Sequence, residues 1–502
     1  MIPGSANSLL LASAGEAGAY FIPRSVRLNS ADSAYLSRTP STAGNRKTWT
    51  WAGWVKLGGA TRNWLFSASE TVNSAIEVFS NGRLYVYHGS GSPGYVGWSG
   101  VLRDYSAWYH LVVTVDTTQA TSTNRVKAYI NGNQITFDEG AQPAQNSEPT
   151  NGINSTSLHN ICRQFSGSAY TVNCYLADIH FIDGQALDPT SFGEFDANGI
   201  WQPIDASGLT YGINGFHLTF SDNSTAASLG DDTSGNNNDW TVNNISVAAG
   251  AGNDSLVDVP TNGTASSGGD AGGVTRGNYC TWNPLINGDT AANGNLDVTN
   301  DTARGTHKLL DYDAYWEITS TGGTTTAGVV SDGGTTNTTT VADTKTYGFK
   351  LSAAGSLDYI NITDGGSFVN ITTGLTGVQF PYASAASATT GSLNAGQRPF
   401  AASAPAGFKG ICTANLPSTT IATSGSYIGN GVADGPFVFL NGVPTAMTIG
   451  GNSVTFGTDA DKLSNGFKIR TTSTTFNQNA STYNYSITST GDPFKTARAQ
   501  AN

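Results

Sequence analysis

A cluster of side-chain oxygens is the first feature of this sequence that suggests chemistry. Asp231, Asp232, Asn236 and Asp239 lie within the stretch DDTSGNNND. Carboxylate and amide oxygens are the ligands that Ca²⁺ takes, so this loop is a candidate calcium site. Its spacing differs from that of an EF-hand loop, and Asp-Asn-Gly stretches also form ordinary turns. Both interpretations stay open, and no other cofactor is predicted.

Aromatic side chains gather at a glycine-rich loop, HGSGSPGYVGWSG, and on the strand before it. Tyr87, His88, Tyr95 and Trp98 are the members of this group that we consider. Exposed Tyr and Trp rings offer flat apolar faces with polar edges, and sugar rings stack on such faces. These four residues are therefore the candidate glycan-binding residues. The alternative is that the rings fill a hydrophobic core.

Catalytic chemistry has little support in the sequence. Glu194 and Asp196 resemble the start of a glycosidase Glu-x-Asp-x-x-Glu motif, but the third position is Gly199. A retaining glycosidase needs two carboxyl groups about 5–5.5 Å apart, and this partial motif follows the last expected strand of its domain. The six histidines are scattered, and neither Gly-x-Ser-x-Gly nor a phosphate-binding Gly-rich loop is present. We expect no catalytic residues and no enzyme.

Strand patterns indicate the fold class. In YHLVVTVD, Tyr109, Leu111, Val113 and Val115 alternate with the other residues, which is the period of a β-strand. The stretch 108–137 then turns back through Asn-Gly, a pair suited to a two-residue hairpin. The chain has 61 Gly and only 12% charged residues. This composition predicts an all-β protein of several β-sandwich or jelly-roll domains.

Charge and length exclude several classes of partner. The formal net charge is −12 and the pI is about 4.8, which disfavours nucleic acid. No apolar run is long enough to span a membrane, and the first residues resemble no signal peptide, so we expect no membrane insertion. The four cysteines are too few for a disulfide scaffold, although Cys162 and Cys174 flank neighbouring strands where a pair is feasible.

Changes in composition divide the chain into five segments. Residues 1–23 are an N-terminal arm for anchoring or subunit contact, and 24–190 are the first β-domain. Residues 191–275 form a connector that contains the Asp/Asn-rich loop, and 276–417 form a second β-sandwich. Residues 418–502 make a small C-terminal β module.

Three of these segments resemble known proteins or families. WYHLVVTVD followed by KAYING resembles the signature of laminin-G-like, concanavalin A-like lectin jelly rolls, and the likeness covers 24–190. YCTWNPL, YWEITS and NAGQRPF resemble a SPRY-like sandwich, in particular in structural proteins of tailed bacteriophages. GNG, NGFKIRT and DPFKTARA resemble the C-terminal ends of large phage proteins, without the aromatic insertion that those usually carry.

The resemblance implies a non-enzymatic virion protein. The expected role is a tail fibre or other host-contacting adhesin on the exterior of the particle, made in the host cytoplasm and binding host surface glycan or protein. It also implies a homo-oligomer, typically a trimer, and contacts with other virion proteins through the N-terminal arm. The alternatives are a capsid decoration or head-fibre protein and, from another class, a polysaccharide-degrading enzyme of concanavalin A-like fold.

Overall fold

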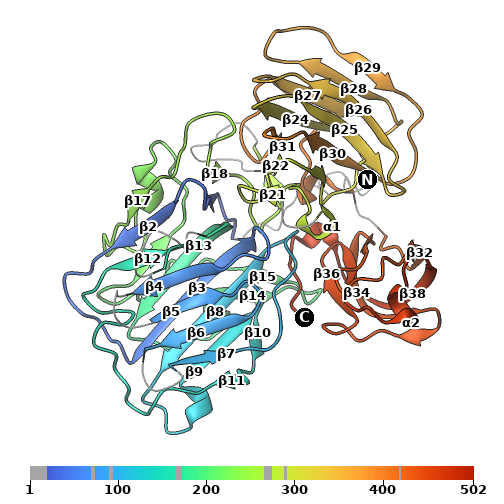
Figure 1. The fold of residues 1–502 in the computed structure, drawn as a ribbon. Helices are drawn as coiled ribbons and strands as arrows, with labels where there is room; N and C mark the ends of the chain where they lie inside the picture. The colour runs from blue at the N-terminus through green and yellow to red at the C-terminus, as the bar shows by residue number, and fades with distance from the viewer. Residues whose placement is uncertain are drawn as a thin grey trace, which may run out of the picture.

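The computed structural model describes residues 20–68, 74–89, 94–164, 172–264, 274–287, 291–417 and 420–502. As predicted, these residues form an all-β protein of several packed sheets, in three parts (Figure 1). Most of the predicted arm, residues 1–19, lies outside the described residues, as do residues 90–93 of the predicted glycan loop. No helix in the described part of the chain has the length and apolar character to cross a membrane.

The first sandwich consists of two antiparallel sheets. The first sheet has the order β10 (Asn133–Ile135), β9 (Val126–Ile130), β8 (Tyr109–Asp116), β3 (Thr48–Leu57), β13 (Cys174–Asp183), β1 (Ser25–Leu28) and β18 (Ser255–Leu256), and β16 (Phe216–Leu218) also pairs with β13. The second sheet has the order β11 (Glu139–Gly140), β7 (Tyr95–Gly97), β6 (Leu84–His88), β5 (Ser74–Val78), β4 (Asn63–Ala68), β12 (His159–Ile161), β2 (Tyr35–Arg38) and β17 (Thr241–Asn243). Residues 191–275 thus contribute β16, β17 and β18 to these sheets.

The predicted hairpin at 108–137 lies in the first sheet. β8 and β9 pair in antiparallel register, with Val113 opposite Ala128. Every second residue of β8 from position 109 to 115 belongs to the core between the two sheets. Asn131 and Gly132 join β9 to β10 with φ angles of 48° and 79°. These are the two left-handed positions that a type I′ turn requires, which explains the Asn-Gly pair.

The first sheet is covered on its outer face as well. The chain before β1 and residues 187–211 supply apolar side chains to this face, among them Ile22, Phe192, Trp201 and Tyr211. This covering layer includes β14 (Gly193–Phe195), β15 (Trp201–Pro203) and the 3₁₀ turn η2 (Pro189–Ser191). Because both faces are covered, β3 and β13 are buried along nearly their whole length. Polar groups on the outer face of β13 must therefore find partners within the protein.

The second sandwich and the C-terminal unit each contain two sheets. The first sheet of the second sandwich has the order β21 (Ala291–Ala292), β22 (Asp297–Thr299), β31 (Thr390–Asn394), β24 (Ala314–Thr321), β27 (Thr346–Leu351), β28 (Leu357–Asn361) and β29 (Val369–Thr372). Its second sheet has the order β23 (Thr302–Arg304), β30 (Gln379–Ala385), β25 (Thr325–Ser331) and β26 (Thr336–Val341). The first sheet of the C-terminal unit has the order β32 (Ser424–Ile428), β38 (Thr482–Pro493), β34 (Gly442–Ile449) and β35 (Asn452–Ser453). Its second sheet has the order β33 (Phe437–Phe439), β37 (Gly466–Ile469) and β36 (Ala460–Leu463). The remaining elements are short: β19 (Gly263–Thr264), β20 (Thr275–Arg276), α1 (Pro284–Asn287) and α2 (Thr474–Asn477), with 3₁₀ turns η1 (Ser122–Asn124), η3 (Ala227–Gly230), η4 (Thr413–Asn415) and η5 (Phe494–Thr496).

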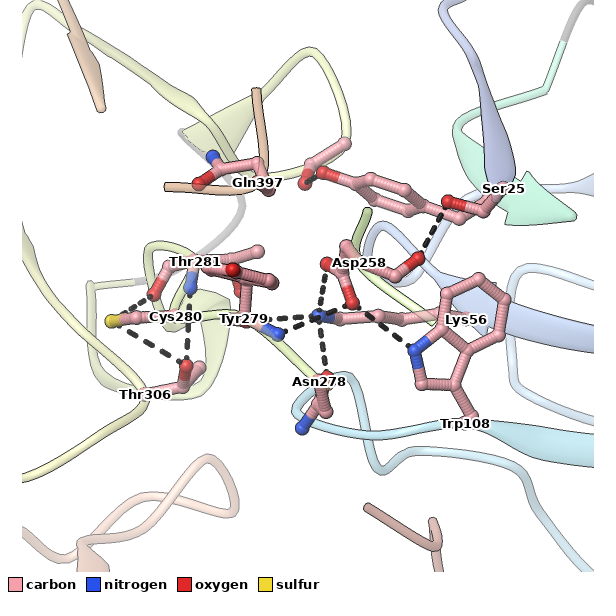
Figure 2. Close-up of polar contacts among 12 residues, drawn as sticks. Ser25, Lys56, Trp108, Asp258, Asn278, Tyr279, Cys280, Thr281, Thr306 and Gln397 are labelled. Atoms are coloured by element: carbon pink, nitrogen blue, oxygen red, sulfur yellow. Dashed lines mark hydrogen bonds and ion pairs between the residues drawn. The ribbon is translucent and has the colours of Figure 1, made fainter. Parts of the chain in front are cut away.

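A buried polar network joins the first and second sandwiches (Figure 2). Lys56 Nζ lies 2.8 Å from Asp258 Oδ2 and donates to Asn278 Oδ1 at 2.7 Å. The other carboxylate oxygen of Asp258 accepts the indole N–H of Trp108 at 3.1 Å and the backbone N–H of Tyr279 at 3.2 Å. Since the charges compensate each other and the polar atoms are satisfied, this network can hold two charged groups away from water. It fixes the two sandwiches to each other.

The end of the chain returns to the first sandwich. Asn502 and Val101 exchange two backbone hydrogen bonds of 3.0 and 2.7 Å. The buried carboxylate of Asp104 accepts the backbone N–H of Ser464 at 2.6 Å and that of Gln500 at 3.0 Å. In Figure 1 the C-terminus accordingly lies between the first sandwich and the C-terminal unit. The C-terminal tail therefore connects the first sandwich to the C-terminal unit.

All four cysteines are buried and free. The Sγ atoms of Cys162 and Cys174 lie 3.6 Å apart, without a bond between them. Burial raises the pKa of Cys162 well above its ordinary value, and it raises the pKa of Cys280 and of Cys412 to about 11. Thiols with such pKa values are protonated and unreactive at neutral pH.

Candidate functional site

Two of the predicted glycan residues belong to an aromatic ladder on the second sheet. Tyr87 in β6 lies opposite Tyr95 in β7, and their ring centroids are 5.7 Å apart. The ring of Tyr85 lies 5.5 Å from that of Tyr95, and its hydroxyl donates to Glu139 at 2.9 Å. All three rings are half-buried, because every second residue of β6 points away from the core. They form a partly exposed surface.

His88 does not share this surface. Its side chain is buried, and Nε2 lies 2.9 Å from the backbone oxygen of Ala141. Burial lowers the pKa of His88 below its ordinary value. The imidazole therefore links β6 to the chain just after β11, and it is not available to a ligand.

Trp98 borders a groove between the edge of the first sandwich and the C-terminal tail. We call this groove, of about 380 Å³, the Trp98 groove. The indole of Trp98 packs over Gly100, where a Cβ atom would lie 2.1 Å from the ring. Five separate stretches of the chain line the groove: Trp98; Ile130, Asn131, Asn133 and Ile135; Phe195 and Gly199; Lys462; and Arg498, Ala499, Gln500 and Ala501.

The apolar part of the groove is built from rings and aliphatic side chains. Phe195 is 47% exposed, and its ring meets Trp201 edge to face with centroids 4.9 Å apart. Trp98 and Ile135 are half-buried against the core of the first sandwich. An exposed Phe held in place by another ring keeps a rigid apolar face open to solvent. Such a face is the kind of surface on which a sugar ring stacks.

Two cations and two amides supply the polar part. Arg498 forms an ion pair with Asp492 beside the groove. Burial lowers the pKa of Lys462, whose ammonium group makes no hydrogen bond or ion pair with the residues that the structure describes. The amides of Asn133 and Gln500 offer both donors and acceptors. An unpaired ammonium group next to rings suits a ligand with hydroxyl groups and a negative charge.

Most polar side chains of the predicted calcium loop form hydrogen bonds with other groups of the protein. Asp232 accepts the backbone N–H groups of His217 at 2.8 Å and of Asn238 at 2.9 Å. Asp239 accepts the N–H of Asp232 at 2.8 Å, and the amide of Asn236 donates to two backbone carbonyls at 2.7 and 2.9 Å. The loop thereby clamps the start of β16. Calcium binding stays a prediction for these residues: Asp231, Asp232, Asn236 and Asp239.

The partial glycosidase motif lies in the turn between β14 and β15. Asp196 accepts the backbone N–H groups of Asn198 and Ile200, both at 2.8 Å, and so fixes the turn. Glu194 is exposed on β14. These contacts give Asp196 a role in the local backbone, next to the ring of Phe195.

A group of metal-ligating side chains meets elsewhere. Asp178 and His180 on β13 and His217 on β16 are buried, and one ligand atom from each lies within 4.8 Å of the others. This is the one such group of three in the part of the chain that the structure describes. No local pattern in the sequence indicates this group, because 39 residues separate Asp178 from His217. The sequence also did not indicate three residues of the groove, which come from distant parts of the chain: Phe195, Lys462 and Arg498.

Comparison with known proteins identifies the first sandwich. Residues 29–186 match the sequence family described as the Concanavalin A-like lectin/glucanases superfamily. The predicted concanavalin A-like jelly roll is therefore confirmed for this part of the chain. A comparison with curated protein sequences found no match.

Comparison with solved structures found matches of low sequence identity and low TM-score, and three of them follow. A SAP-like pentraxin from Limulus polyphemus is 16% identical, with 34% of this chain and 80% of that chain covered and a TM-score of 0.26. A Bacteroides ovatus protein named as a candidate carbohydrate-binding protein is 13% identical, with 45% and 58% covered and a TM-score of 0.32. The PSpry domain of TRIM65 is 12% identical, with 23% and 89% covered and a TM-score of 0.20.

Proposed function

We propose that this chain is a non-enzymatic structural protein of a tailed bacteriophage virion, and that it binds glycan on the host surface as a tail fibre or similar adhesin. The resemblance of residues 276–417 and 418–502 to phage structural proteins supports the virion role. The lectin-type jelly roll at 29–186 supports binding of sugar. The single observation that carries the binding role is the Trp98 groove.

The groove favours an acidic saccharide. Trp98 and Phe195 provide faces for pyranose rings, and Lys462 and Arg498 provide positive charge within the same groove. The whole chain has a net charge of −12, so a negatively charged polymer is repelled by the average surface. Selectivity for such a ligand then depends on the local cations. The volume of about 380 Å³ falls in the range of roughly 300–1,000 Å³ that small-molecule sites occupy.

The protein binds its ligand without large rearrangement of its parts. The Lys56–Asp258 network holds the first and second sandwiches together, and Asp104 holds the C-terminal unit and the tail against the first sandwich. Residues from the first sandwich, the C-terminal unit and the tail all line the groove. A groove assembled from parts that are already fixed loses little entropy when a ligand enters.

A glycan array tests this function directly. The full chain is applied to immobilised acidic and neutral oligosaccharides from bacterial capsules and lipopolysaccharides. We expect retention on acidic glycans that weakens as salt is raised, because the ligand contacts unpaired positive charge. Lys462→Gln should lower retention about tenfold, whereas Lys345→Gln, which removes a half-buried lysine of the second sandwich that pairs with Asp364, should not. Retention that is equal on neutral and acidic glycans contradicts the acidic-ligand assignment.

Two further measurements address the rest of the proposal. A reducing-sugar assay on the retained polysaccharide should detect no released ends, and steady release would contradict a non-enzymatic role. Imaging of gold-labelled antibody against the chain on intact particles should place label on the tail. Label spread over the capsid faces would favour a decoration role instead. Light scattering of the purified chain should give the mass of a homo-oligomer, with a trimer as the expected state.

A further inference from the structure

The buried group of Asp178, His180 and His217 has the geometry of a metal site. His217 Nε2 lies 2.7 Å from Asp178 Oδ1, and His180 Nε2 lies 3.4 Å from Asp178 Oδ2. The two imidazole rings stack with centroids 4.0 Å apart and an angle of 21° between their planes. Both Nε2 atoms therefore face the same carboxylate. Spacings of about 3 Å between donor atoms are what ligands about 2.0–2.2 Å from one ion require.

A β-bulge creates this arrangement. The register between β13 and β3 shifts between Ala177 and His180, so β13 carries one more residue than β3 at this point. Asp178 sits in the bulge with a φ of 52°. Ile179 and Cys174 belong to the main core, so the extra residue turns Asp178 to the same outer face as His180. Without the bulge, the alternation set by Cys174 and Leu176 would continue and would turn both Asp178 and His180 toward the core between the sheets.

The negative charge of the buried Asp178 carboxylate favours binding of a cation. The ion pairs of Asp178 within the described residues involve the two histidines and no Lys or Arg. Tyr20 and Tyr211 lie beside the site. The other charged groups that raise the pKa of these tyrosines are acids, Asp205 and Asp232. A buried carboxylate is costly unless a positive charge compensates it. A divalent cation held by the three side chains supplies that charge.

We propose that Asp178, His180 and His217 bind one Zn²⁺ ion. Two imidazole nitrogens and one carboxylate oxygen are a donor set that suits Zn²⁺, and the three groups fill three of four tetrahedral positions. The mixture of nitrogen and oxygen donors does not suit Ca²⁺, which takes oxygen ligands. This site is distinct from the predicted calcium loop and from the Trp98 groove.

The neighbouring hydroxyl groups orient the ligands. His180 Nδ1 lies 2.9 Å from the hydroxyl oxygen of Tyr211, which itself donates to the backbone oxygen of Ala206 at 3.4 Å. With Nδ1–H donating to Tyr211, Nε2 of His180 keeps its lone pair for the ion. Tyr20 donates to Asp178 Oδ1 at 3.0 Å and fixes the carboxylate.

The ion has a structural role in this position. It connects β13 with β16, which reaches the first sheet from a distant part of the chain. Asp232 of the Asp/Asn-rich loop holds the backbone N–H of His217, so that loop positions a zinc ligand. Bound zinc should therefore stabilise the covering layer of the first sandwich, which contains Phe195 of the groove.

Elemental analysis of the full chain, purified without a metal-affinity tag, tests the proposal. We expect about one Zn²⁺ per chain. His217→Ala and Asp178→Asn should lose the ion, whereas His159→Gln, which changes another buried histidine of the first sandwich, should keep it. Retention of zinc at the same ratio in His217→Ala would overturn the assignment.

Two measurements on the unaltered chain keep the test decisive if the variants do not fold. After treatment with a chelator and desalting, the melting temperature should fall, and ZnCl₂ should restore it while CaCl₂ should not. Co²⁺ added to the stripped chain should give visible absorption bands of a four-coordinate site with histidine ligands. No zinc in the purified chain, no response of melting to ZnCl₂ and no Co²⁺ bands together overturn the proposal. A chain that CaCl₂ alone restores would instead support the calcium loop and contradict the zinc site.

Discussion

His217 Nε2 lies 2.7 Å from Asp178 Oδ1, although 39 residues separate the two in the sequence. The pairing of β16 with β13 brings them together, with His180 directly opposite His217 in the register. The carboxylate of Asp232 accepts the backbone N–H of His217 and so helps to position this histidine. The stretch after residue 190 is thus an integral layer of the first sandwich, and the groove and the metal-ligand group both depend on it.

The glycine opposite the bulge predicts a defined loss of stability. Gly53 faces the bulge in β13, and a Cβ atom there would lie 2.3 Å from Ile179 Cδ1 in the buried core. Gly53→Ala should destabilise the chain by about 1–3 kcal/mol, because the packed core leaves Ile179 no room to move. Urea unfolding measures this cost. Gly208→Ala, where no atom lies within 4 Å of the new Cβ, is the matched control. Equal stability of the two variants would show that the bulge tolerates a larger neighbour.

Acid should unfold this protein readily. Burial lowers the pKa of His159 and His180 to about 4 and that of His110 and His307 to about 3. The unfolded chain takes up protons near the ordinary histidine value of about 6.5, so between that pH and about 4 it binds more protons than the folded chain. Stability is therefore present in full above pH 6.5 and falls as the pH falls. Each histidine contributes up to about 1.4 kcal/mol per pH unit.

Buried carboxyl groups act in the opposite direction. Burial raises the pKa of Asp104 to about 6, so the stability that its protonated form contributes is present below about 3.8 and is lost as the pH rises through 6. Burial also raises the pKa of Glu77, Asp254, Asp258 and Glu317. We expect the four histidines to dominate between pH 6.5 and 4, because burial lowers their pKa values to about 3 or 4. Urea unfolding at pH 7, 6, 5 and 4 should give a steady fall in unfolding free energy toward acid. A flat or rising profile over this range would contradict the assignment of neutral buried histidines.

The junction between the sandwiches should be sensitive to the loss of one charge. Lys56→Met leaves the carboxylate of Asp258 buried without its cation, and we expect a cost of about 3–5 kcal/mol. Lys56→Met combined with Asp258→Asn should cost less than Lys56→Met alone, because the uncompensated charge is gone. Urea unfolding of the two variants provides the comparison. A double variant that is no more stable than Lys56→Met alone would contradict this explanation.

The sequence predicted the fold better than it predicted the site. The alternation in β8 and the turn at Asn131-Gly132 are local, and each could be recognised from a few residues. The break in alternation at Asp178 was also local: Cys174 and Leu176 alternate into the core, but the next core residue is Ile179. This shift of phase is a signal of a bulge that could have been read from the sequence.

The groove and the metal-ligand group had no such signal. Trp98 was predicted from its glycine-rich surroundings, and it does line the groove. Phe195 belonged to a motif considered only for its acids, and Lys462 and Arg498 lie more than 300 residues after Trp98 in the chain. Which distant segments meet depends on the packing of the covering layer and the tail, and no local pattern encodes that packing.

The most direct test of the central claim is the affinity for the best acidic oligosaccharide from the array, measured by calorimetry for the full chain and for Trp98→Ala combined with Phe195→Ala. Phe368→Ala, which removes a half-buried ring of the second sandwich, is the control, and melting curves confirm that each variant is folded. The Trp98 groove predicts a loss of affinity of at least about tenfold in the double variant and none in the control. Unchanged affinity in a folded double variant would contradict binding in this groove.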